Sequence, residues 1–211
     1  MSGRIEIDLF STLDGVMQAP GGAEEDPEEG FAFGGWQAPV DDDAVGDEVI
    51  AGIRRIDALL LGRRTYDIFA GYWPQQLGPG GAANEIARVF DGIPKYVASR
   101  GTPDLRWRDS HHLGSDLAAE IAALRERHRE IHVIGSIDFA RTLVREGLFD
   151  QLNLWVYPIV LGPGKRLFTS DGPPASFTLL PSSRVSEQGA LLLHYAPKGT
   201  TPTTAEMGKR D

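Results

Sequence analysis

Three short segments place a glycine or serine just before a turn or the start of a helix, a pattern that binds anions. They read LLLG-RRT, VAS-RGT and VIG-SID, around Gly62, Ser99 and Gly135. Glycine lets a ligand approach the backbone closely, and the free amides at a helix N-terminus attract phosphate. Arg100 can place a guanidinium on a further phosphate. Helix capping explains each segment alone, but the three together make a phosphate-bearing ligand an equally good interpretation.

The glycine-rich signatures of the common nucleotide-binding folds are absent. Neither Gly-x-Gly-x-x-Gly nor Gly-x4-Gly-Lys-Ser/Thr occurs, which argues against a standard dinucleotide fold or a phosphate-loop nucleotidase. The string LGPGKR at 161–166 follows an expected strand with different spacing. It favours a tight hairpin turn, although Lys165 and Arg166 can also approach an anion.

Other catalytic chemistries find little support. The chain has no cysteine, which excludes thiolate metal sites and cysteine nucleophiles. Ser11, Thr65 and Ser136 lack a Gly-x-Ser-x-Gly setting, so acyl transfer is unsupported. The histidines show no metal-type spacing with carboxylates, and the adjacent pair is expected in a solvated loop. They are His111, His112, His128, His132 and His194.

The elements that must position these segments alternate between strands and helices. Alternating or continuous apolar residues predict strands at 4–10, 57–62, 94–99, 130–135, 151–161, around 175–185 and at 191–196. Apolar stripes of helical period predict helices at 42–56, 63–72, 82–90 and 115–127, and a further helix capped by Asp138 that ends at Glu146. This order predicts an α/β fold with a mostly parallel sheet and antiparallel strands at the C-terminal edge.

One domain is expected, covering residues 1–197, followed by a polar tail at 198–211. Residues 18–40 are rich in Gly, Pro and Glu and have no periodicity. A loop this long in a compact domain is usually a lid or disordered. Three aromatic residues near its end, Phe31, Phe33 and Trp36, favour a lid that contacts other parts of the protein.

Composition and charge limit the partners. Of 211 residues, 41% are hydrophobic and 24% charged, which is enough for a packed core. The net charge of −9 argues against broad nucleic-acid binding. No apolar stretch approaches the roughly 20 residues of a membrane span, and the first residues lack a signal-peptide pattern. With the missing cysteines, these features predict a cytoplasmic protein without a membrane or nucleic-acid partner.

Several longer strings carry a resemblance to a known family. They are STLDG (11–15), LLLGRRTYDIFAGYWP (59–74), KYVASR (95–100), VIGSIDFARTL (133–143) and LFDQLNLWVYPIVLGPGKRLF (148–168). Together they resemble the dihydrofolate-reductase superfamily, and more closely the stand-alone proteins related to the reductase domain of bifunctional riboflavin deaminase-reductase. The resemblance spans about residues 4–196. It implies a mostly parallel sheet of about eight strands flanked by helices, an NADPH site and, commonly, a homodimer.

The resemblance also implies which residues hold NADPH. One turn matches the family's pyrophosphate-binding turn, a second matches the positions that hold the adenosine 2′-phosphate, and a third stands beside the nicotinamide and pyrophosphate. In that order the turns are Gly62, Arg63, Arg64 and Thr65; Ser99 and Arg100; and Gly135, Ser136 and Ile137. Ser136 replaces the second glycine of the family's Gly-Gly pair, whose peptide bond is cis.

Hydride transfer to a C=N bond needs a proton source, and two carboxylates are candidates. The string WQAPVD at 36–41 has its Trp, Pro and Asp at the spacing found in the substrate-side segment of dihydrofolate reductases. Asp41 is therefore one candidate, although an acidic run before a helix is also typical of capping. Asp14 follows the first strand beside the expected nicotinamide position, and its alternative is a simple Leu-Asp-Gly turn.

A flat substrate would need aromatic walls. The candidates for substrate contact are Trp36, Tyr66, Phe69 and Trp155, although aromatic residues also dominate cores. The resemblance thus implies an NADPH-dependent reductase of a small heterocycle, such as a pterin, dihydrofolate or an aminopyrimidine of riboflavin synthesis. The alternative is a non-catalytic NADP-binding or sensor protein on the same fold. No metal is expected.

Overall fold

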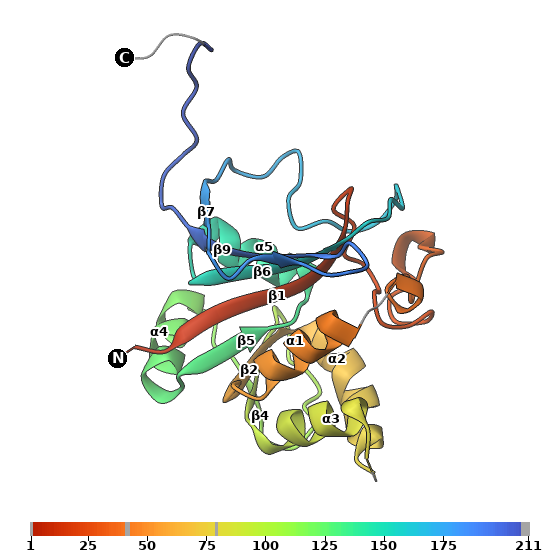
Figure 1. Cartoon of the computed structure of the whole chain (residues 1–211). Coiled ribbons are helices and arrows are strands. Elements are labelled where there is room, and N and C mark those ends of the chain that lie inside the picture. Colours follow the sequence, from red (N-terminus) through yellow and green to blue (C-terminus); the bar gives the residue numbers. More distant parts are fainter. Residues whose placement is uncertain (1, 41–42, 79, 208–211) are drawn as a thin grey trace.

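The computed structural model describes residues 2–40, 43–78 and 80–207, and a single sheet runs through the centre of this part of the chain (Figure 1). Its strands are β1 (Arg4–Thr12), β2 (Ala58–Gly62), β3 (Lys95–Ala98), β4 (Ser110–His112), β5 (Glu130–Val133), β6 (Gln151–Tyr157), β7 (Phe177–Leu179), β8 (Arg184–Val185) and β9 (Leu191–Pro197). The helices are α1 (Asp43–Ile53), α2 (Arg63–Tyr72), α3 (Ala82–Gly92), α4 (Leu117–Arg127) and α5 (Ile137–Glu146), with short 3-10 turns η1 (Glu28–Gly30), η2 (Ala38–Val40) and η3 (Trp73–Gln76).

The strand order confirms the predicted fold class. It is β4-β3-β2-β5-β1-β6-β9-β7, with β8 also paired to β9. Neighbours from β4 to β6 are parallel, whereas β9 is antiparallel to β6, β7 and β8. The carboxyl ends of the parallel strands therefore all lie at the same edge of the sheet. The C-terminal strands β9, β7 and β8 extend the sheet beyond β6.

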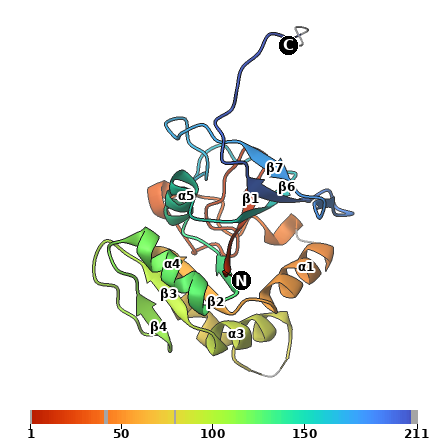
Figure 2. The same ribbon diagram turned by 90° about the vertical axis from the view of Figure 1, so that its left-hand side faces the viewer.

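The two faces of the sheet differ because side chains alternate along each strand. On β1, Ile5 and Ile7 are fully buried in a core that includes residues of α4 and α5. A second core joins β2 to α2 and α3, and α1 and α4 lie on opposite sides of the sheet (Figure 2). Glu6 and Asp8 alternate with the core residues of β1, so they point to the α1 face.

Two local predictions need correction. The histidine pair expected in a solvated loop forms β4, in which His111 is paired with Tyr96 of β3. Three polar residues carry no strand signal of their own, so only the pairing with β3 shows this strand. Asp138 does not cap α5, because Ser136 holds the cap position and Asp138 forms an ion pair with Arg141 at 2.5 Å.

Strand boundaries near the C-terminus are also shorter than predicted. β6 ends at Tyr157, directly before Pro158, which has no N–H to donate to a neighbouring strand. The expected strand at 175–185 is divided into β7 and β8. Residues 198–207 are exposed and extend away from the sheet (Figure 1). Within the described residues, no helix is long and apolar enough to cross a membrane.

Candidate active site

The three predicted anion-binding turns meet at one cavity of about 1690 Å³ at the carboxyl ends of β2, β3 and β5. Ligands of α/β sheets bind at this edge. The volume exceeds the roughly 300–1,000 Å³ of a pocket for one small molecule, so it is enough for more than one small ligand. All the predicted cofactor positions line the cavity: Gly62, Arg63, Arg64, Thr65, Ser99, Arg100, Gly135, Ser136 and Ile137.

Two glycines hold the turns after β2 and β5 in contact. The Gly62 amide donates a hydrogen bond to the Gly135 carbonyl at 3.0 Å. A Cβ on Gly62 would lie 2.2 Å from Ser136 Oγ, and a Cβ on Gly135 would lie 2.6 Å from Thr65 Oγ1. Gly135 also has a φ of +118°, which side chains disfavour. The peptide bond between Gly135 and Ser136 is cis, as the resemblance implies.

Two helices begin at the cavity with their amides available. α2 starts after Gly62 and α5 after Ser136, and neither cap residue accepts a side-chain hydrogen bond from its helix. The first N–H groups of a helix have no partner within the helix and carry the positive end of the helix dipole. Because both helix starts line the same cavity, a ligand with two linked phosphates suits this edge of the sheet.

The segment 18–40 forms ion pairs with two basic residues that line the cavity, Arg64 and Lys165. Asp26 and Glu28 bind Arg64 of α2, with Asp26 Oδ1 3.2 Å from Arg64 Nη1. Both carboxylates also lie 2.5 Å from Lys165 Nζ, in the loop after β6. A phosphate that reaches Arg64 must therefore compete with these two carboxylates. The pairing confirms that this segment contacts other parts of the protein.

Trp36 holds the segment 18–40 against β6 and does not line the cavity. Its indole Nε1 donates to the Gln18 carbonyl at 2.8 Å, and its ring packs edge-on against Tyr157 with centroids 5.7 Å apart. The Gln18 side chain in turn donates to the carbonyls of Asp26 and Glu28. The predicted substrate contact at Trp36 is therefore corrected to a structural role.

Of the other three predicted substrate residues, two line the cavity and one belongs to the core. Phe69 and Trp155 line the cavity. Tyr66 is 1% exposed, lies in the core between β2 and the helices, and accepts a hydrogen bond from the Trp107 amide at 3.0 Å. Its side chain cannot reach a ligand from there, so Tyr66 is a core residue.

Asp14 is held in a turn next to the loop after β6 and does not line the cavity. Its carboxylate accepts hydrogen bonds from the Thr12 hydroxyl at 2.6 Å and the Gly162 amide at 2.8 Å, and forms an ion pair with Arg166 at 3.2 Å. Partial burial raises the pKa of Asp14, but the hydrogen bonds from Thr12, Gly162 and Leu161 outweigh it and lower the pKa to about 2. Such a carboxyl holds no proton to donate at neutral pH. The other candidate, Asp41, lies outside the described residues.

We expect Asp14→Asn to weaken the fold rather than the chemistry. A pKa lowered from 3.8 to about 2 corresponds to about 2 kcal/mol of stability at pH 7. A carboxyl with a lowered pKa contributes fully above its unfolded value, so the difference from the wild type should narrow as the pH falls from about 4 to 2. Urea unfolding between pH 7 and 3 measures this. Asp104→Asn, in an exposed pair with Arg106, is the control and should change stability by less than about 0.5 kcal/mol. Equal stability of Asp14→Asn and wild type at pH 7 would contradict the structural role.

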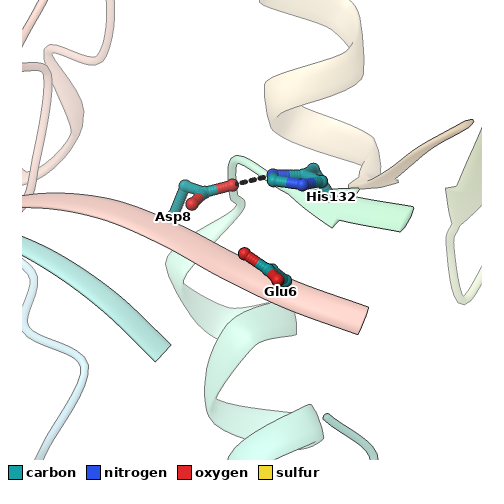
Figure 3. A group of neighbouring side chains, drawn as sticks. All are labelled: Glu6, Asp8 and His132. Carbon is teal, nitrogen blue, oxygen red and sulfur yellow. Dashed lines mark hydrogen bonds and ion pairs between the residues drawn. The ribbon is translucent and has the colours of Figure 1, made fainter. Parts of the chain in front are cut away.

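Sequence reasoning missed a group of polar residues on the α1 face of the sheet. Glu6 and Asp8 of β1 lie beside His132 of β5, with His132 Nδ1 2.5 Å from Asp8 Oδ2 (Figure 3). Asn153 of β6 donates to Asp8 at 2.8 Å and to Glu6 at 3.1 Å, and contacts His194 of β9 at 2.6 Å. All five line the cavity.

The charge of this polar group follows from its contacts. Burial alone lowers the pKa of His132, but the charges of Asp8, Glu6 and Glu130 and the hydrogen bond to Asp8 outweigh it and raise the pKa above its usual value. Burial lowers the pKa of His194. The signal in the sequence was the polar half of the alternating strand patterns at Glu6, Asp8 and His132. That half is buried here because α1 covers it, and strand periodicity alone does not show which face a helix covers.

Comparison with known proteins agrees with this architecture. Residues 4–191 match the family of the RibD C-terminal domain. The uncharacterized protein YyaP of Bacillus subtilis is 26% identical over 170 residues, covering 78% of this chain and 80% of that protein. A putative riboflavin biosynthesis protein from Shewanella sp. PV-4 superposes with a TM-score of 0.64 at 19% identity, over 92% of this chain and 99% of that one.

Dihydrofolate reductase from Enterococcus faecalis, solved in complex with NADP(H), has the same fold. The TM-score is 0.53 at 14% identity, over 94% of this chain and 98% of that chain. The mostly parallel sheet with its antiparallel C-terminal edge is thus a dihydrofolate-reductase-like fold, and the chain belongs to the RibD C-terminal domain family.

Proposed function

We propose that the protein is an NADPH-dependent reductase that transfers hydride to a small flat heterocycle of the pterin or aminopyrimidine type. The observation that carries this proposal is the meeting of two uncapped helix starts and Arg100 at one cavity large enough for a dinucleotide and a second ligand. Membership of the RibD C-terminal domain family and a fold shared with dihydrofolate reductase favour the same chemistry.

The residues present suit this cofactor. Amides at Arg63, Thr65 and Ile137 are placed to bind a pyrophosphate, because they begin α2 and α5 at the cavity. Ser99 and Arg100 would hold a phosphate at the end of β3. The bound nicotinamide supplies the hydride, and the protein's own part is to orient the two ligands and exclude water.

A titration of NADPH and NADH, followed by tryptophan fluorescence, tests the cofactor. Trp155 on the cavity wall should respond to a bound ligand. Micromolar NADPH binding with much weaker NADH binding is expected. If neither NADPH nor NADH binds, the protein shares only its fold with the dinucleotide-dependent reductases, and the reductase proposal is wrong.

A non-catalytic NADP-binding or sensor protein is the second candidate. It is favoured by one observation, that the Asp14 carboxyl is ionised and lies away from the cavity and so supplies no proton. NADPH oxidation in the presence of pterins, flavins and aminopyrimidines separates the two candidates. Tight NADPH binding without oxidation by any of these compounds would favour the sensor.

A further inference from the structure

An acidic turn at residues 25–28 lies against two basic side chains of the cavity wall. Its carboxylates at Asp26 and Glu28 line the cavity. So do the two cations that they contact, Arg64 in the first turn of α2 and Lys165 in the loop after β6. The acidic turn therefore neutralises positive charge at the wall where the proposed function needs a binding site for phosphate.

Each carboxylate of the acidic turn contacts both cations. The Asp26 carboxylate lies 3.2 Å from Arg64 Nη1 and 2.5 Å from Lys165 Nζ, and the Glu28 carboxylate contacts the same two groups. A single exposed ion pair contributes little, whereas this network holds each side chain through two contacts. The side chains of Asp26 and Lys165 are only 12% and 19% exposed, so each charge depends on its partners for compensation.

A buried glutamine fixes the acidic turn in this position. Gln18 is 2% exposed, and its side-chain amide donates to the carbonyls of Asp26 and Glu28. Its side-chain oxygen accepts from the Lys165 amide at 3.2 Å. Gln18 thus joins the acidic turn to the loop that carries Lys165, and the chain itself supplies two negative charges to the two cations.

Two carboxylates carry about the charge of one phosphate group. A phosphate monoester has a charge of about −1.5 to −2 at neutral pH and several strong acceptor oxygens. Arginine and lysine are its usual partners in proteins. A phosphate-bearing ligand and the acidic turn therefore need the same N–H donors of Arg64 and Lys165, and the two cannot use these donors fully at the same time.

We propose that the acidic turn is an internal competitor for the anionic ligand of the cavity. Asp26 and Glu28 bind Arg64 and Lys165, and the phosphates of an incoming ligand displace these carboxylates and release the turn. Because the competitor is part of the chain, its effective concentration is about millimolar, and an anion that binds the cations weakly does not displace it. Calling the ligand a dinucleotide rests on the proposed function, whereas the competition itself does not.

The rest of the segment 18–40 is held by contacts that do not involve the two cations. Trp36 donates to the Gln18 carbonyl and packs against Tyr157. Phe31 belongs to the same apolar cluster as Trp36 and Tyr157. These contacts persist when the ion pairs are broken, so displacement of the carboxylates frees the acidic turn without unfolding the segment.

The test is calorimetric titration of the full-length protein with sodium pyrophosphate at pH 7 and constant ionic strength. The variant that combines Asp26→Asn with Glu28→Gln should bind pyrophosphate at least about 10-fold more tightly than the wild type, because the ligand no longer breaks charged hydrogen bonds. The matched control combines Glu24→Gln with Glu29→Gln, which removes the same charge from exposed positions of the same segment. It should change the affinity by less than about 2-fold.

Hydrogen exchange measured by mass spectrometry tests the release of the acidic turn in the wild type. The amides of Glu25, Gly30 and Phe31 donate to carbonyls within the segment. Saturating pyrophosphate should accelerate exchange over residues 25–31. In the variant that combines Asp26→Asn with Glu28→Gln, exchange there should be fast without pyrophosphate and unaffected by it.

Three results would each overturn the inference. They are an equal or lower pyrophosphate affinity in the variant that lacks both carboxylates, absence of pyrophosphate binding to both proteins, and exchange in the wild type that pyrophosphate does not accelerate. Titration of the same proteins with NADPH separates this inference from the proposed function. If pyrophosphate behaves as expected and NADPH does not bind, the reductase proposal fails and the competition stands. If NADPH binds and pyrophosphate binds equally tightly to both proteins, only this inference fails.

Discussion

Replacing Arg100 by alanine should remove most of the preference for NADPH over NADH. Arg100 follows β3 and lines the cavity beside Ser99, and in the proposed function it holds the phosphate that NADH lacks. A charged hydrogen bond contributes roughly 1.5–3 kcal/mol, which corresponds to about 10- to 150-fold in affinity. The ratio of the two dissociation constants, measured by tryptophan fluorescence, should fall by that factor, while the affinity for NADH stays nearly constant.

Arg106→Ala is the matched control for this prediction. The Arg106 side chain is 81% exposed, pairs with Asp104 and does not line the cavity. Arg106→Ala removes the same positive charge as Arg100→Ala, from a position close to it in the sequence. This variant therefore measures the effect of net charge alone on cofactor binding. An unchanged NADPH to NADH ratio in Arg100→Ala, or an equal loss of affinity for both cofactors, would contradict the assignment.

Replacing Gly135 by alanine should damage both the fold and the proposed cofactor site. The new Cβ would lie 2.6 Å from Thr65 Oγ1, and the φ of +118° is strained for any side chain. Backbone strain and overpacking together cost about 2–4 kcal/mol. For a chain of this length, that lowers the melting temperature by roughly 5–15 °C. Where the overlap is relieved by a shift of the start of α2 away from the turn after β5, NADPH affinity should also fall.

Gly46→Ala is the control, and its expected effect on the melting temperature has the opposite sign. Gly46 lies within α1, and a Cβ there would contact nothing within 4 Å. Alanine is favoured over glycine in a helix by about 1 kcal/mol, so this variant should melt at the same temperature or higher and bind NADPH normally. A Gly135→Ala protein with wild-type melting temperature and NADPH affinity would show that the contact between the turns is dispensable.

The turns that line the cavity could be predicted from the sequence because each depends on a local pattern. A buried strand that ends in glycine and leads into a helix is visible around Gly62 and Gly135. Parallel strands then bring their carboxyl ends to one edge without further information. The same reasoning failed for Tyr66 and Trp36, because an aromatic residue in the core has the same local pattern as one on a cavity wall.

The alternation of strands and helices, the parallel sheet with its antiparallel edge, and the turns at Gly62, Ser99 and Gly135 could all be predicted from the sequence. These depend on periodicity and on residue types that favour turns, which act over a few positions. That the pKa of Asp14 is lowered depends on the folded chain, since two of the amides that donate to its carboxylate, those of Gly162 and Leu161, are distant in the sequence. The tertiary structure also decided that Glu6 and Asp8 face a cavity, because the burial of a polar strand face depends on which helix packs over it.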